Sequence, residues 1–90
     1  QTIVNNESRE IVRMLDREFA AFARPDSDFC PEPLRDLIDQ TIDAIYRPIN
    51  NGVYRSGFAT SQTAYEEAVT ELFEHLDRWE EILGHQRYLC

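Results

Sequence analysis

The sequence predicts a mainly α-helical protein made of a short strand end, one helix, a linker and then two long antiparallel helices. Three observations predict it. Apolar residues recur every three or four positions in three stretches of the chain. Three of the four prolines gather within residues 24–33, which is typical of a linker between two packing units. A short β-branched run, residues 2–4, precedes the first helical stretch.

The first stretch is a strand end followed by a helix. The β-branched run stops at Asn5-Asn6, where polar side chains can turn the backbone and cap a helix. From Glu7 the spacing becomes helical. One apolar stripe contains Ile11, Leu15, Phe19 and Phe22. This helix is expected to end near Ala23, because Pro25 disfavours helical backbone in the residue before it.

The second helix is expected over residues 33–50. Proline is tolerated in a first helical turn, so Pro33 can stand at its start. Its apolar stripe contains Leu34, Leu37, Ile38, Ile42, Ile45 and Ile49. Pro48 is expected to kink the helix, because proline lacks an N–H group and crowds the preceding turn. Residues 50–52, Asn-Asn-Gly, then either break the helix or start a shorter helical turn through Ala59.

The third helix is expected over residues 61–83. Thr60 and Thr63 are both candidate N-caps, and Thr63 with Glu66 fits a capping box. Its apolar stripe contains Tyr65, Ala68, Val69, Leu72, Phe73, Leu76, Trp79 and Leu83. Gly84 is the expected C-cap. Two amphipathic helices of this length are expected to pack antiparallel. The facing stripes would contain Leu37, Ile38, Ile42 and Ile45 on one helix and Leu72, Phe73 and Leu76 on the other.

Composition and charge exclude several classes of function. The 42% apolar and 29% charged residues are typical of a soluble globular protein rather than a disordered one. Acidic residues number 17 against 9 basic ones, and the net charge of −8 repels phosphate backbones and anionic lipids. The longest apolar run, residues 19–23, is too short to cross a bilayer. We therefore expect neither a nucleic-acid partner nor a membrane partner.

The cysteines and the first residue predict the location and the origin of the chain. Cys30 and Cys90 form no CxxC pair and no cluster of metal ligands, so no metal is expected. A long helical chain with only two cysteines is typical of the reducing cytoplasm. The chain begins with Gln1 rather than Met, which indicates a segment excised from a longer protein.

The turn at residues 5–8, Asn-Asn-Glu-Ser, has two interpretations. Unsatisfied N–H groups at a helix start favour a carboxylate or a phosphate. Ser8 can donate a hydrogen bond to such a carboxylate while Glu7 accepts one from an ammonium group, so the pair suits the α-amino-acid end of a small ligand. Alternatively, the same residues serve only as a helix cap, as Ser and Asn commonly do.

Four segments of the chain resemble a known family. Residues 2–15 look like the last strand and third helix of the thioredoxin-like domain of glutathione transferases. Residues 50–59, AsnAsnGlyValTyrArgSerGlyPheAla, resemble a signature of the glutathionyl-hydroquinone reductases, an xi-class, omega-like branch. Residues 62–69 and 86–89 resemble the same branch.

The resemblance implies a division of the chain into three regions. Residues 1–24 would end a thioredoxin-like domain, residues 25–33 would form the interdomain linker, and residues 34–90 would begin an all-helical transferase domain. The family's nucleophile is the cysteine of a Cys-Pro motif, which the resemblance places before Gln1. No catalytic residue is therefore assigned within the chain, and the chain alone is expected to be inactive.

The resemblance also implies a function, the reduction of glutathionyl-hydroquinones. Glutathione is then a substrate whose γ-glutamyl group is held by Glu7 and Ser8, and an aromatic quinol adduct is the second substrate. Tyr54 is implied to point its hydroxyl into the acceptor pocket, whereas the residues alone favour a tyrosine that packs a helix kink. The parent protein is expected to be a cytoplasmic homodimer.

Two other functions stay open. One is a non-catalytic, transferase-like helical module kept for protein contacts. The other is an enzyme that uses a different low-molecular-weight thiol, because Glu7 and Ser8 would read only an amino-acid end. Cys30-Pro31 is a poor substitute nucleophile, since it lies in the expected linker without a strand before it.

Overall fold

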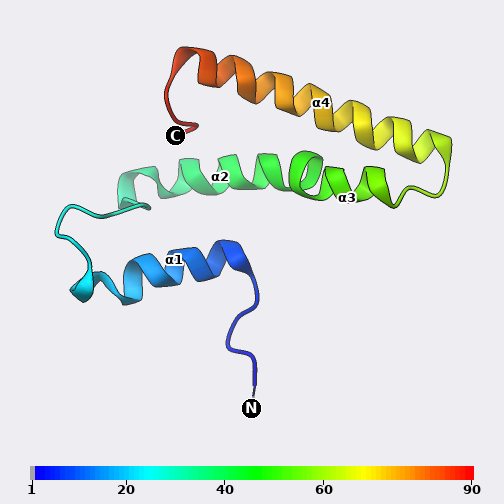
Figure 1. Ribbon diagram of the computed structural model, residues 1–90. Coiled ribbons are helices and arrows are strands. Elements are labelled where there is room, and N and C mark those ends of the chain that lie inside the picture. The colour runs from blue at the N-terminus through cyan, green and yellow to red at the C-terminus, as the bar shows by residue number, and fades with distance from the viewer. Residues whose placement is uncertain (1) are drawn as a thin grey trace. The chain divides into compact units, whose positions relative to one another are not determined.

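Residues 2–90 are described here from a computed structural model, and the chain forms two compact units. The first unit ends at Arg35 and the second extends from Asp36 to Cys90. Helices and turns make up the described residues, so the prediction of a mainly α-helical protein is confirmed. Figure 1 shows the four α-helices in chain order.

The first unit is built around α1 (Ser8–Glu18), which continues into a 3-10 turn, η1 (Ala20–Phe22). This agrees with the predicted helix, except that its last turn is tightened. The apolar stripe is not covered within the unit, and Phe22 remains 87% exposed. A shallow hollow of about 590 Å³ runs along this stripe, lined by apolar residues that include Val12, Leu15, Phe19, Phe22 and Phe29.

The predicted strand end at residues 2–4 is wrong for the described chain. These residues have no strand conformation in the structure. A strand requires a neighbouring strand to bond its N–H and C=O groups, and no other described segment is extended in this way. The β-branched composition of residues 2–4 is a preference that only such a partner can satisfy.

The second unit consists of a nearly continuous helical rod and one long helix. The rod contains α2 (Arg35–Ile45), which begins at the boundary between the units, a π-helical turn, η3 (Tyr46–Asn50), and α3 (Asn51–Gly57). A second 3-10 turn, η2 (Glu32–Leu34), precedes the rod. After a short turn, α4 (Gln62–His85) runs back antiparallel to α3, as the sequence predicts (Figure 1).

Pro48 is accommodated by the π-helical turn rather than by the sharp kink expected from the sequence. It is buried inside this turn. Because proline has no N–H to donate, the helix loses one internal hydrogen bond there, and the backbone widens by one residue instead. The N–H of Asn51 accordingly donates to the carbonyl of Tyr46, five residues back. Residues 50–52 therefore continue the rod into α3 rather than break it.

Both predicted caps of the last helix are wrong. The N-cap is Ser61, whose hydroxyl accepts a hydrogen bond from the N–H of Ala64 at 3.2 Å, and neither Thr60 nor Thr63 serves. Gly84 lies inside the helix, which ends at His85, and the C-cap is Gln86 with an extended backbone. A glycine C-cap needs a left-handed backbone, and no described glycine adopts positive φ.

The long helix packs on α3 and on the π-helical turn rather than on the predicted stripe of α2. The most enclosed positions are small, with Gly52 and Ala68 both buried, and Ala68 only 1% exposed. Leu37, Phe73 and Leu76, which were predicted to face one another, remain 47%, 58% and 41% exposed. Small residues allow two helical backbones to approach closely, so the contact forms where Gly and Ala stand rather than where Leu and Ile are most frequent.

The close approach at Gly52 predicts opposite effects for a small and a large substitution. A Cβ at Gly52 would lie 3.7 Å from the Cβ of Leu72, which is ordinary contact. Gly52→Ala should therefore raise the free energy of unfolding by up to about 1 kcal/mol through helix propensity. Gly52→Leu adds atoms where Leu72 already lies and should cost about 1–3 kcal/mol.

Gly84 offers a matched control, because it is also helical but a Cβ there meets nothing within 4 Å. Gly84→Leu should be tolerated where Gly52→Leu is not. The denaturation midpoints of the four variants, measured in the full-length protein that carries this chain, check both statements. Equal midpoints for Gly52→Leu and Gly84→Leu would contradict the close helix approach.

Candidate functional site

The turn before α1 is ordered by Asn5 rather than by Glu7 or Ser8. The side-chain oxygen of Asn5 accepts a hydrogen bond from the N–H of Glu7 at 2.8 Å, and its Nδ2 donates to Glu10 Oε2 at 2.6 Å. Glu7 is the N-cap residue, with extended backbone and no side-chain capping hydrogen bond. Its carbonyl accepts the first two bonds of the helix, from the N–H groups of Glu10 and Ile11, each at 3.0 Å.

Because Asn5 orders the turn, Glu7 and Ser8 keep side-chain groups that a ligand at the helix start can contact. Ser8 is the first helical residue and is exposed, so its hydroxyl does not occupy the capping position. The N–H group of Ser8 precedes the first intrahelical donor, so this group and the Ser8 hydroxyl are donors that the helix itself does not use. A ligand carboxylate can accept from these donors, while the half-buried Glu7 carboxylate can accept from an ammonium group.

Tyr54 lies on α3, in the middle of the short helix that follows the π-helical turn. Its side chain is 66% exposed, so it does not pack the irregular part of the rod, as the residues alone had suggested. Its backbone is held, because its carbonyl accepts from the N–H of Phe58 at 2.9 Å. The position from which its ring extends therefore depends on the position of α3 rather than on side-chain packing.

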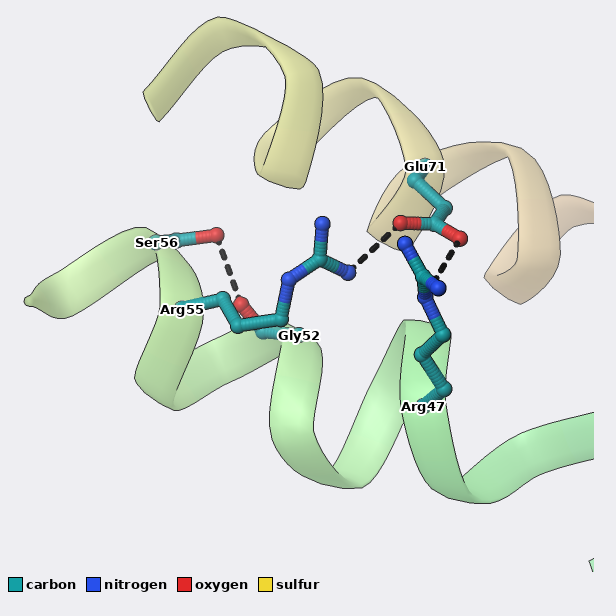
Figure 2. Close-up of polar contacts among 5 residues, drawn as sticks. All are labelled: Arg47, Gly52, Arg55, Ser56 and Glu71. Carbon is teal, nitrogen blue, oxygen red and sulfur yellow. Dashed lines mark hydrogen bonds and ion pairs between the residues drawn. The ribbon is translucent and has the colours of Figure 1, made fainter. Parts of the chain in front are cut away.

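A carboxylate on the long helix joins α3 and the π-helical turn. Nη1 of Arg55 donates to Glu71 Oε2 at 2.6 Å, and Nε of Arg47 lies 3.7 Å from Glu71 Oε1. Figure 2 shows both arginines extending from one ribbon to Glu71 on the ribbon above, one arginine to each oxygen. We call Arg47, Arg55 and Glu71 the Glu71 clamp. Next to it, the Ser56 hydroxyl donates to the carbonyl of Gly52 at 2.7 Å.

The clamp is charged at neutral pH. The hydrogen bond from Arg55 lowers the pKa of Glu71 below its ordinary value of 4.5, and the charges of Arg55, Arg47 and His75 act in the same direction against partial desolvation. Because the folded-state pKa is the lower one, the contribution of the clamp to stability is complete above the ordinary value. That contribution is lost as the pH falls through the lowered value.

Sequence analysis did not single out Arg55 and Glu71. The two residues are sixteen positions apart and meet only because α3 and α4 turn back on each other. The sequence does show opposite charges on two helices that are expected to pack together, which indicates that an ion pair can form between them. The signal does not name the partners, because the register between the helices depends on the close approach at Gly52 and on the π-helical turn.

The cysteines are not arranged for catalysis. Cys30 is a free thiol that is only 7% exposed, its N–H donates to Asp28 Oδ1 at 3.0 Å, and its carbonyl accepts from Nε of Arg35 at 3.3 Å. A buried structural thiol is a poor nucleophile because a substrate cannot reach it. Within residues 2–90 no group of three or more His, Cys, Asp or Glu side chains is placed to hold a metal ion.

No protein-family model matches the chain, but comparison with known proteins finds similar sequences. It is 52% identical over 88 residues to the glutathionyl-hydroquinone reductase YqjG of Escherichia coli, a match that covers 98% of this chain and 27% of that protein. It is 47% identical over 87 residues to the glutathionyl-hydroquinone reductase PcpF of Sphingobium chlorophenolicum. The chain is a homologue of the glutathionyl-hydroquinone reductases. The resemblance stated from the sequence is confirmed.

Solved structures that resemble this chain belong to the same group of proteins. An xi-class glutathione transferase from Natrialba magadii matches with a TM-score of 0.91 and 59% identity, covering 98% of this chain and 27% of that one. The glutathione-bound structure of the E. coli protein matches with a TM-score of 0.90 and 52% identity, covering 98% and 29%. The chain thus spans little more than a quarter of the length of these relatives.

The described helices of this chain were also compared with the requirements of a membrane span. Within residues 2–90, no helix combines the length and the apolar character that a membrane crossing requires.

Proposed function

We propose that this chain is part of a glutathione-dependent enzyme that reduces glutathionyl-hydroquinones. In it, Glu7 and Ser8 hold the γ-glutamyl group of glutathione, and Tyr54 lines the pocket for the aromatic acceptor. The observation that carries the proposal is the turn before α1. There Asn5 supplies the side-chain hydrogen bond to the backbone, and Glu7 makes no capping bond.

The regions of the chain follow from this function. Residues 1–24 end the thioredoxin-like domain, residues 25–33 link it to the helical domain, and residues 34–90 begin that helical domain. The names of two relatives support the substrates, since both are glutathionyl-hydroquinone reductases, and the E. coli relative has been solved with glutathione bound. The two free cysteines agree with a cytoplasmic location, where glutathione keeps thiols reduced. The whole enzyme is a homodimer in this proposal.

The reaction has two steps, and its nucleophile is a cysteine thiolate outside this chain. The thiolate attacks the sulfur of the adduct, so that an S–S bond forms and the carbon–sulfur bond breaks. The electron pair left on the ring takes a proton and gives the hydroquinone. A second glutathione then attacks the mixed disulfide and releases glutathione disulfide. The cysteine thiolate is the leaving group of this second step and is thereby regenerated. The ring carbon is reduced, while the sulfur of the adduct and the sulfur of the second glutathione are oxidised to the disulfide, so no other oxidant or reductant is required.

The residues of this chain would act on the two ends of the adduct. The first turn of α1 holds the amino-acid end of glutathione through the N–H group and the hydroxyl of Ser8, and the Glu7 carboxylate accepts from its ammonium group. The Tyr54 hydroxyl shares a hydrogen bond with a quinol oxygen, which orients the leaving ring. Because Tyr54 is largely exposed within this chain, its hydroxyl is free to meet a bound ring.

The isolated chain should show no turnover of glutathionyl-hydroquinones. Its cysteines are the buried Cys30 and the exposed Cys90, and in this proposal neither is the nucleophile. The full-length protein assayed in parallel with a glutathionyl-hydroquinone and glutathione should be active. Turnover by the isolated chain that disappears in Cys30→Ser would make Cys30 the nucleophile. An inactive full-length protein that still binds glutathione would instead favour the non-catalytic module.

A further inference from the structure

Glu71 of the clamp contacts the chain both before and after Tyr54. Arg47 belongs to the π-helical turn before α3, and Arg55 is the residue directly after Tyr54. Each arginine contacts a different oxygen of the same carboxylate, which belongs to α4 (Figure 2). One side chain of the long helix therefore contacts the residues on either side of the candidate acceptor-pocket tyrosine.

The segment between the two arginines is short and irregular, and it also packs on the long helix. An α-helix of 7 residues, such as α3, is too short to be stable by itself. The π-helical turn before it has a less regular backbone than an α-helix. Besides the ion pairs, both elements pack on α4, with Gly52 buried close to Leu72. Rotation of α3 about that packing contact would move the exposed Tyr54 ring, and the ion pairs with Glu71 oppose that rotation.

We infer that Glu71 is a positioning residue for the acceptor pocket, because it fixes the direction of Tyr54 through Arg55 and Arg47. The inference rests on the proposed function, since it takes Tyr54 as the residue that meets the quinol. Arg55 carries most of the effect, because its hydrogen bond is short and its side chain is half as exposed as that of Arg47, at 36% against 74%. Glu71 itself touches no substrate in this account.

The test compares Glu71→Gln with Tyr54→Phe in the full-length protein. Glutamine keeps the size of the side chain and removes the charge that both arginines contact. Glu71→Gln should lower kcat/KM for the glutathionyl-hydroquinone by roughly 10- to 100-fold, the range that follows from misplacing a reacting group by about 1 Å. The affinity for glutathione should not change. The turnover of a small aliphatic mixed disulfide of glutathione, which offers Tyr54 no quinol oxygen, should not change either.

The double variant distinguishes positioning from a general loss of structure. If Glu71 acts through Tyr54, Glu71→Gln should have almost no further effect once the Tyr54 hydroxyl is absent. Glu80→Gln is the matched control, because Glu80 is an exposed glutamate on the same helix away from the clamp, and it should leave every parameter unchanged. Arg55→Gln should reproduce the effect of Glu71→Gln, and Arg47→Gln should do so more weakly.

Two results would overturn the inference, and they differ in what they imply for the proposed function. Unaltered kinetics in Glu71→Gln, or an equal loss with and without the Tyr54 hydroxyl, would remove the positioning role while leaving Tyr54 in the pocket. Unaltered turnover in Tyr54→Phe itself would remove Tyr54 from the pocket, and the role of Glu71 with it.

Discussion

Ser8→Ala is expected to weaken glutathione binding by roughly 10- to 150-fold. The change removes one hydrogen bond to a charged carboxylate, and such bonds contribute about 1.5–3 kcal/mol. Stability should change little, because Ser8 is exposed and its hydroxyl does not hold the capping position at this helix start. Titration calorimetry with glutathione on the full-length protein, together with the KM for glutathione, measures the expected loss.

Ser61→Ala is the matched control for this variant. Ser61 also stands at a helix start, but its hydroxyl does cap the helix through the N–H of Ala64. Its loss should cost about 1 kcal/mol of stability and leave glutathione affinity unchanged. The two serines are therefore expected to give opposite patterns. If Ser8→Ala lowers the denaturation midpoint as Ser61→Ala does and binds glutathione normally, Ser8 is a cap and nothing more.

Tyr54→Phe is expected to lower turnover of the quinol adduct by roughly 10- to 150-fold, the range for losing a hydrogen bond to a charged group, because the ring carries the electron pair of the broken carbon–sulfur bond until it takes a proton. The ring remains, so the pocket keeps its shape. Glutathione affinity should stay the same. Stability should also stay the same, because the side chain is 66% exposed. Steady-state kinetics with the adduct as the varied substrate give the result.

Tyr88→Phe provides the control for Tyr54→Phe. Tyr88 is 65% exposed, nearly the same as Tyr54, and the guanidinium of Arg87 lies 5.4 Å from its ring centre. Removing its hydroxyl should change neither turnover nor glutathione affinity. Equal turnover in the two variants would return Tyr54 to the role of an ordinary surface tyrosine.

The parts of the fold that depend on local periodicity could be predicted from the sequence. The apolar stripe from Ile11 to Phe22 and the longer repeat after residue 61 each place a helix within a few residues of its observed bounds. The antiparallel order of the last helix follows from the short turn before it. These features are properties of neighbouring residues, so a single sequence contains the information.

The parts that depend on packing between segments could not be predicted. Pro48 allowed a kink, a break or a widened turn, and the choice depends on how the rod packs against α4. The candidate caps Thr60 and Thr63 and the observed cap Ser61 have similar chemistry, and only the observed backbone favours Ser61. The apolar stripe of α2 predicted the wrong helix contact, and Gly84 predicted the wrong helix end. Both predictions failed because packing between segments decides these features.

The candidate site divides in the same way. The Asn-Asn-Glu-Ser turn could be found from the sequence, because polar residues at a helix start are typical of both helix capping and anion binding. Tyr54 came from the resemblance alone, since an exposed tyrosine on a short helix has no local signature. The Glu71 clamp depends on the register between α3 and α4, which two charge patterns do not determine.

The central claim is that two sites in this chain serve the two ends of one bound adduct, and crossed kinetics of Ser8→Ala, Tyr54→Phe and the double variant test it most directly. Glutathione and the quinol adduct are varied separately in the full-length protein. The account predicts that Ser8→Ala changes glutathione affinity, that Tyr54→Phe changes only turnover of the quinol adduct, and that the losses multiply in the double variant. Normal glutathione affinity in Ser8→Ala together with normal adduct turnover in Tyr54→Phe would contradict it.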